Sequence, residues 1–211
     1  MKYGELPKSI GIVKIDCLEM MFYQYLPIKL IGNTEPVYEN RLKCFDKLVG
    51  VACCDFIGEY GLNRYVDSYV YLTAKHMYQP PKQSFNRLGW HSDGFLTDDI
   101  NYIWCDKYPT VFNNSVFQLT PDDVISMAEM DAQAKPENDV LFKENELLRL
   151  NQFNIHRVAE VTKGCFRTFG KVSFSKDKYD LVGNSRNYLL GYNWEMKQRK
   201  DERNIPQSKI N

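Results

Sequence analysis

Three residues of this chain combine the types and spacing that could bind a transition metal. His91 and Asp93 lie two residues apart in the stretch RLGWHSDGF, residues 87–95, and His156 follows 63 residues after Asp93. Alternate side chains of an extended segment point the same way, so the first two could share one face of a strand. Two imidazoles and one carboxylate can occupy one face of an Fe(II) octahedron and leave three positions open. The pattern predicts a metal site built from these three residues.

A plainer explanation of the first two residues is a turn. Gly89 and Gly94 bracket the tripeptide His-Ser-Asp, and serine, aspartate and glycine are common turn residues. The remaining histidine, His76, lies in an alternating run of valine and tyrosine and is predicted to be structural. Trp90 either packs over a substrate or belongs to the core. The turn and the metal site both remain open explanations at this level.

Strand-like segments are predicted to position these residues. Residues 8–32 are rich in β-branched and aromatic types, which favours short strands that break near Pro27. Residues 64–78 alternate as one long strand, and residues 99–112 resemble two strands around a turn. Most of the run from 140 to 194 is also strand-like. The pattern predicts a mainly β (α+β) fold.

Two helices are predicted beside these strands. Thr34 is a candidate N-cap for the first, which would carry one apolar face. That face would consist of Leu42, Phe45, Leu48, Val49 and Ala52. Thr120 is the candidate N-cap of the second helix, which is expected to end near Gln133. Both helices are expected to support the sheet.

Composition narrows the class of protein. The chain has 211 residues, 44% of them hydrophobic, which suffices for one domain with a substantial core. Lys and Arg together number 27, and Asp and Glu together also number 27, so the formal net charge is zero. This balance does not favour broad nucleic-acid binding, although a local basic groove would make such binding possible again. No apolar run is long enough for a signal peptide or a membrane span, so a cytoplasmic protein is expected. Six cysteines without a C-x-x-C pair are expected to be free thiols.

Three motifs together resemble the 2-oxoglutarate and Fe(II)-dependent dioxygenases. They are HSD at 91–93, HRVAEV from 156 and CFRTFGKVSFS from 165, within a region of about residues 64–175. The resemblance implies a double-stranded β-helix, or jelly roll, with flanking helices. It also implies a single domain over 1–211, with N-terminal strands and a supporting helix in 1–63, the jelly-roll core in 64–195 and a charged tail in 196–211.

The resemblance implies a role for each matched residue. His91, Asp93 and His156 would ligate Fe(II), and Arg167 would bind the far carboxylate of 2-oxoglutarate, since guanidinium geometry suits a carboxylate. Dioxygen would be the second co-substrate, and an unidentified substrate would be hydroxylated while 2-oxoglutarate yields succinate and CO₂. Thr168 and Phe169 follow Arg167 where many members carry Arg-x-Ser. The missing hydroxyl partner is therefore sought among Tyr71, Thr73 and Tyr102.

Several alternatives remain open. Residues 156–174 could form a hairpin in which Glu160 pairs with Arg167 across the strands and no ligand is needed. The protein could be a jelly roll that binds a metal or ligand without oxidising anything. The substrate is expected to be a small molecule, but a nucleic-acid base or a protein side chain could undergo the same chemistry. Loops 79–90 and 131–146 are the expected lids or specificity elements.

Overall fold

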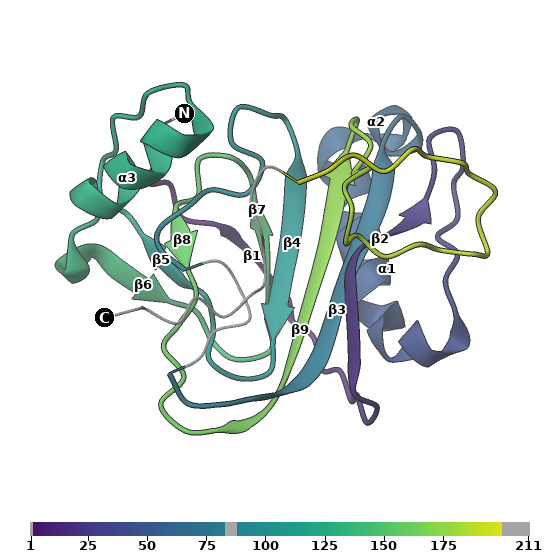
Figure 1. Ribbon diagram of the computed structural model, residues 1–211, viewed down its shortest axis with the longest axis horizontal. Helices are drawn as coiled ribbons and strands as arrows, with labels where there is room; N and C mark the ends of the chain where they lie inside the picture. The colour runs from purple at the N-terminus through teal and green to yellow at the C-terminus, as the bar shows by residue number, and fades with distance from the viewer. Residues whose placement is uncertain (1, 83–87, 200–211) are drawn as a thin grey trace.

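The computed structural model describes residues 2–82 and 88–199, and these form two antiparallel sheets with few helices (Figure 1). The larger sheet has six strands. In spatial order they are β1 (Lys8–Ile12), β7 (Glu146–Leu150), β4 (Ile100–Cys105), β9 (Cys165–Ser175), β3 (Tyr69–Gln79) and β2 (Met21–Lys29). The predicted mainly β fold is confirmed.

The smaller sheet holds the strand that carries His156. Its order is β6 (Asp139–Leu141), β5 (Val111–Asn113) and β8 (His156–Arg157), and a single bridge joins His91 to His156 at its edge. The chain passes from the larger sheet to the smaller between β4 and β5, returns at β7, enters the smaller sheet again at β8 and returns at β9. Because β8 pairs with β5 while β9 pairs with β3 and β4, the hairpin alternative for 156–174 is wrong.

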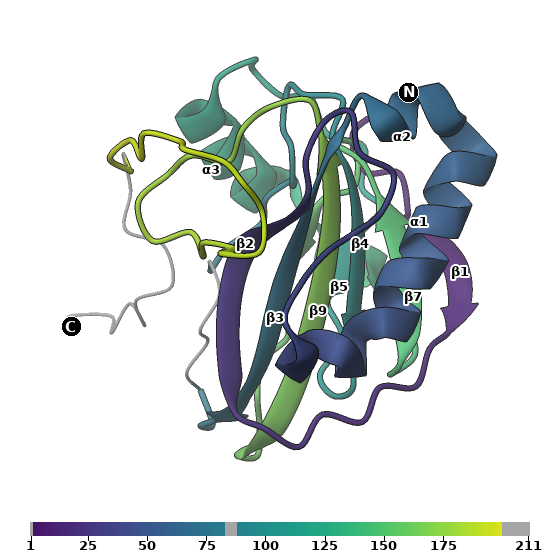
Figure 2. The same ribbon diagram turned by 90° about the vertical axis from the view of Figure 1, so that its right-hand side faces the viewer.

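The helices lie on both sides of the larger sheet. The 3-10 helix η1 (Asn40–Phe45) leads into α1 (Asp46–Tyr60) and the short α2 (Leu62–Val66), and Figure 2 shows α1 running across one face of the larger sheet. Helix α3 (Asp123–Gln133), followed by the 3-10 helix η2 (Pro136–Asn138), lies beside the smaller sheet (Figure 1). The predicted apolar stripe from Leu42 to Ala52 is confirmed, since all five of its members are buried in the core.

Strand β9 separates the core from the space between the sheets. Val172 and Phe174 belong to the core under α1, where Phe174 stacks on Phe56 at 4.1 Å between ring centres. A Cβ on Gly170 would lie 2.5 Å from Leu48 Cδ2, so a glycine at this position lets α1 approach closely. Alternation along the strand directs Lys171 the opposite way, between the two sheets.

Two predicted boundaries are wrong. Strand β2 continues through Pro27, which pairs with Tyr71, because β2 is an edge strand with irregular register where a missing N–H costs little. The strand predicted over 64–78 begins only at Tyr69, since residues 62–66 form α2. The strands expected within 99–112 are confirmed as β4 and β5.

Both predicted helix caps are also wrong. Thr34 lies before η1, and no side chain caps α1. At α3 the cap is Asp122, whose carboxylate accepts from the backbone N–H groups of Val124 and Ile125, both at 2.9 Å. The Thr120 hydroxyl instead donates to Glu129 at 2.7 Å. The predicted end of this helix at Gln133 is confirmed.

The first residues of the predicted tail contact the segment of the chain that precedes them. Lys197 forms a bridge with Leu181 and an ion pair with Asp180 at 2.8 Å, and Arg199 donates to the carbonyl of Val182. The rest of the tail, residues 200–211, and residues 83–87 of the predicted lid loop lie outside the described residues. Across residues 2–82 and 88–199, no helix is both long and apolar enough to cross a membrane.

Candidate metal centre

The three predicted ligands lie together between the sheets. One ligand atom from each of His91, Asp93 and His156 falls within 4.8 Å of the other two. The backbones of the two histidines exchange N–H to carbonyl hydrogen bonds, each 2.9 Å long. Their imidazole rings lie 4.5 Å apart between centres. The smaller sheet therefore fixes the spacing of the two imidazoles.

Hydrogen bonds to the backbone set the orientation of both imidazoles. Nδ1 of His91 lies 3.1 Å from the carbonyl of Gly89, and Nδ1 of His156 lies 2.9 Å from the carbonyl of Asn154. A carbonyl only accepts, so each Nδ1 carries a proton, and Nε2 is the ring nitrogen that a metal ion could coordinate. Metal-binding histidines are commonly held in this way. Both Nε2 atoms are suited to coordinate an ion.

Asp93 follows the bridge in a turn. Gly89 and Gly94 flank the HSD stretch with φ of +82° and +71°, in the left-handed region that favours glycine. The hydroxyl of Ser92 donates to the carbonyl of Gln152 at 2.5 Å. The turn explanation of this sequence is thus correct for Asp93, while His91 forms a strand bridge. Both explanations describe part of the same segment.

An ammonium group shares the Asp93 carboxylate with His156. Lys171 Nζ lies 2.6 Å from Oδ2 of Asp93, and Nε2 of His156 lies 3.6 Å from the same oxygen. Burial alone would raise the pKa of Asp93, but the charge of Lys171 and a hydrogen bond with His156 hold it well below its usual range. Burial alone would lower the pKa of Lys171, but Asp93 raises it. The carboxylate and the ammonium are both charged.

A cavity of about 370 Å³ opens beside this ion pair. Lys171, Asn101 and Tyr25 line it from the larger sheet, and Asp93 lines it from the turn after His91. Met127 of α3 and the segment from Lys178 to Asn184 line other parts of it. A molecule in this space would touch the carboxylate of the candidate metal centre.

Tyr25 enters this cavity from a strained bulge. Its φ is +47°, which a tyrosine rarely adopts, and the register of β2 shifts between Tyr23 and Leu26. Its backbone N–H donates to the hydroxyl of Thr73 at 3.0 Å. The ring centre lies 5.4 Å from Lys171 Nζ. Strained residues cluster at functional sites, and this one places an aromatic ring against the ammonium.

Sequence reasoning missed both Lys171 and Tyr25. Lys171 had a visible signal, because it is a charged residue four positions after Arg167 in a strand-like run, and therefore on the same face. Tyr25 had none, since nothing in the sequence marks the bulge.

Arg167 is held by backbone groups at one end of the space between the sheets. Its Nε donates to the carbonyl of Lys107 at 2.7 Å and its Nη2 to that of Tyr108 at 3.1 Å. No ion pair joins it to Glu160 within the described ranges, so that alternative explanation of the arginine is also wrong. The two bonds leave other guanidinium N–H groups that could serve a ligand.

The three hydroxyls considered as partners for Arg167 bond elsewhere. Tyr71 donates to the carbonyl of Asp177, and Thr73 accepts from Tyr25. Tyr102 donates to Asp55 of α1 at 2.7 Å, on the opposite face of the sheet from Lys171. The structure brings none of these three hydroxyls to the guanidinium.

Other residues singled out in the sequence have structural contacts. Trp90 packs in a cluster with Phe117 and Met130, and its ring lies 4.9 Å from the guanidinium of Arg157. Arg157 pairs with Asp139 at 3.0 Å. Nδ1 of His76 lies 2.9 Å from the hydroxyl of Thr168, which agrees with a structural role.

Lys75 adds a second buried cation near the site. It lies on β3, and burial lowers its pKa to about 8, with further lowering by the charges of Arg167 and Lys171. The ladder pairs Lys75 with Phe169 and Thr73 with Lys171, so Lys75 faces the same side as Arg167 and Lys171. We refer to Lys75, Arg167 and Lys171 as the inner cations.

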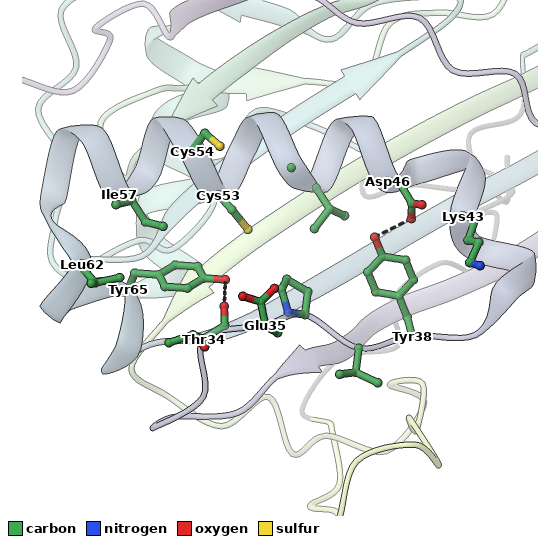
Figure 3. A pocket seen from close by; sticks show the side chains of 14 residues that line it. Thr34, Glu35, Tyr38, Lys43, Asp46, Cys53, Cys54, Ile57, Leu62 and Tyr65 are labelled. Carbon is green, nitrogen blue, oxygen red and sulfur yellow. Dashed lines mark hydrogen bonds between the residues drawn. The ribbon is translucent and has the colours of Figure 1, made fainter.

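A second cavity, of about 660 Å³, lies between α1 and the segment from Thr34 to Tyr38 (Figure 3). Its polar side chains largely satisfy one another or the backbone. Tyr38 donates to Asp46 at 2.8 Å and Tyr65 to the carbonyl of Thr34 at 2.9 Å. Burial raises the pKa of the Cys53 thiol to about 11, which disfavours the reactive thiolate. The cavity contains no histidine and offers no comparable metal-binding group.

Comparison with known proteins finds no family model that matches this sequence, and a search of curated proteins finds no significant match. The assignment of the site therefore depends on the sequence motifs and on the geometry described above.

Proposed function

We propose that this protein is a non-haem Fe(II) and 2-oxoglutarate-dependent dioxygenase that hydroxylates a small molecule. The observation that carries this proposal is the convergence of His91, Asp93 and His156, each of which brings a ligand atom within 4.8 Å of the other two. Two imidazoles and one carboxylate on one side of an ion are the ligand set of non-haem Fe(II) oxygenases. Imidazole nitrogen and carboxylate oxygen are donors that a divalent transition-metal ion accepts.

The order of the strands supports a jelly roll. Along the chain, β3, the His91 bridge, β4 and β5 alternate between the two sheets, and so do β7, β8 and β9. Strands that alternate between two packed sheets are a feature of jelly rolls. It brings His91 and His156 of the smaller sheet to face Lys171 of the larger one.

The inner cations support an anionic co-substrate. 2-Oxoglutarate carries two carboxylates, and a cluster of cations, two of them buried, is an environment that can bind them. The lowered pKa of Lys75 reflects burial and repulsion from Arg167 and Lys171, both of which a bound dianion would relieve. Arg167 keeps the role that the sequence motif implied, with Lys75 as a second carboxylate-binding group.

Each group at the proposed site then has its own role. Bound Fe(II), with 2-oxoglutarate and dioxygen, supplies the oxidising chemistry. His91 and His156 are oriented by the backbone carbonyls of Gly89 and Asn154. The cavity beside Asp93 holds the substrate close to the ion and limits access of water.

The cavity favours a small molecule over a nucleic acid. Its lining includes three acidic and three basic side chains: Asp93, Asp123, Asp180, Lys171, Lys178 and Arg199. A site for a polyanion would show an excess of basic groups. The balanced lining suits a compact polar substrate.

One observation favours a second candidate, a jelly-roll protein that binds ligands without metal chemistry. Lys171 already neutralises Asp93 at 2.6 Å, so the carboxylate is compensated without an ion. In this case the cavity would bind a ligand, and the triad would be part of an ion-pair network.

The test is anaerobic addition of Fe(II) and then 2-oxoglutarate to the apoprotein. We expect a weak visible charge-transfer band that is lost in His156→Ala and kept in His76→Ala, the control at the structural histidine. Iron binding without the band would keep the metal site and remove 2-oxoglutarate from the proposal. Failure to bind iron at all would remove the metal site and favour the second candidate.

A further inference from the structure

The ammonium of Lys171 lies where it would compete with a metal ion for the Asp93 carboxylate. Its ammonium lies 2.6 Å from Oδ2 of Asp93, and Nε2 of His156 is the other group near that oxygen, at 3.6 Å. Lys171 is buried, with 8% of its side chain exposed. The carboxylate that would complete the metal site is thus already bound by an internal cation.

We propose that Lys171 competes with the metal ion for Asp93. Its ammonium stays paired with the Asp93 carboxylate until an ion displaces the ammonium, and this competition sets the metal affinity of the site. This inference rests on the proposed metal site. It goes beyond the ligand assignment because it gives a non-ligand residue control over whether the site is loaded.

The ammonium of Lys171 and a bound metal ion would repel each other if both contacted the same oxygen of Asp93. A divalent ion bound by His91, His156 and Asp93 would place two positive charges close to the ammonium. Repulsion between charges a few ångströms apart is strong where water is largely excluded. Binding of the ion must therefore weaken or break the contact between Lys171 and Asp93.

The surroundings allow the ammonium to move. Lys171 has a flexible four-carbon side chain and borders the cavity of about 370 Å³. The Tyr25 ring already lies 5.4 Å from Nζ, and an aromatic face attracts a cation. The strained bulge at Tyr25 provides this alternative contact without removing the charge from the site.

The same lysine stabilises the metal-free protein. A carboxylate placed between the sheets without a partner would be costly, and Lys171 supplies that partner. One residue thus lowers the free energy of the empty site and raises that of the loaded site. By linkage, its removal has opposite effects on folding of the apoprotein and on metal affinity.

The experiment measures Mn(II) affinity from the loss of the free-ion EPR signal. We compare the wild type with Lys171→Met, which removes the charge, and Lys171→Gln, which keeps a hydrogen-bond donor and is less disruptive to folding. Lys176→Met is the matched control, because Lys176 follows the same strand but pairs with Asp98 at 3.1 Å. Both Lys171 variants should bind Mn(II) about tenfold more tightly or better, with the control unchanged.

A second measurement needs no variant. Lysines of the wild-type protein are acetylated briefly with and without Mn(II), and the sites are quantified by mass spectrometry. Lys171 should be modified more in the presence of Mn(II), because it has left its carboxylate partner, while Lys176 should not change. Equal modification of Lys171 in both states would overturn the inference.

The outcomes separate this inference from the proposed function. Equal affinity of the wild type and both Lys171 variants would overturn the competitor role and leave the metal site standing. Binding only by the Lys171 variants would support the competitor role and show that the wild type is normally metal-free. Absence of binding in every protein would overturn the metal site and this inference with it.

Discussion

His91 and His156 are 65 residues apart in the sequence, yet their backbones exchange two hydrogen bonds of 2.9 Å. This pairing makes the spacing of the two imidazoles a property of the smaller sheet. A change that disturbs the sheet at β8 should therefore affect the candidate metal centre as directly as a change to a ligand.

Metal should stabilise the folded protein through these histidines. Because the unfolded chain lacks the site, saturating Mn(II) or Zn(II) at about 100 times the dissociation constant should add about 2.7 kcal/mol to the free energy of unfolding. Thermal unfolding with and without a chelator measures the effect. His156→Ala should lose the stabilisation, and His76→Ala should retain it. A metal-induced shift that survives His156→Ala would contradict the ligand assignment.

The inner cations should bind 2-oxoglutarate. Arg167→Ala and Lys75→Met should each weaken its binding to the metal-loaded protein by at least about tenfold, since each removes a charge that pairs with a carboxylate. Anaerobic calorimetric titration measures the dissociation constant. The matched control is Arg41→Ala, because Arg41 lies on η1 and pairs with Glu19 at 3.4 Å. Full affinity in both inner-cation variants would assign the guanidinium of Arg167 a purely structural role at Lys107 and Tyr108.

Lys29 should make stability depend on pH in the alkaline range. It is fully buried, donates to the carbonyls of Leu30, Val66 and Ser68, and burial lowers its pKa to about 8. Between about pH 8 and 10 the unfolded chain holds the proton more tightly than the folded one, so the free energy of unfolding rises with pH.

The contribution of Lys29 to that rise should be about 2–3 kcal/mol. Urea unfolding of the wild type and Lys29→Met at several pH values isolates it, because other groups titrate in both proteins. The free energy of unfolding of the wild type minus that of Lys29→Met should increase as the pH rises. Parallel curves would show that Lys29 keeps an ordinary pKa.

Arg149 should be a structural residue without influence on the metal. It joins β7 to α1 through Asp55 at 2.8 Å and Glu59 at 3.1 Å, and Asp55 also accepts from Tyr102. Arg149→Met leaves Asp55 without its cation and should cost about 3 kcal/mol in unfolding free energy. Tyr102→Phe should cost about 1 kcal/mol. Chemical denaturation measures both losses, and a changed Mn(II) affinity in either variant would contradict the separation of the two faces.

Local patterns predicted the parts of the structure that depend on local chemistry. Alternating residues predicted β4 and β9, and the three- and four-residue spacing from Leu42 to Ala52 predicted the buried face of the first helix. The proximity of His91, Asp93 and His156 could be predicted because two of only three histidines stand in a recognisable order with an aspartate. The caps at Thr34 and Thr120 failed because several polar residues at each site could serve, and packing selects among them.

Features that depend on which strands pair could not be predicted. The period-two pattern of residues 156–174 fits a hairpin as well as two strands in opposite sheets, and only the pairing of β8 with β5 decides. Lys171 acquires its role from Asp93, which is 78 residues away. Tyr25 depends on a bulge that the hydroxyl of Thr73 stabilises from the neighbouring strand.

Strand β9 also limits how this protein can change over evolutionary time. Its odd-numbered positions provide Arg167 and Lys171, while its even-numbered positions provide Gly170, Val172 and Phe174 to the core. A single inserted or deleted residue would exchange the two sets, placing Lys171 under α1 and Val172 against Asp93. Descendants of this chain can therefore vary β9 only by substitution, and changes in length are confined to the connections between strands.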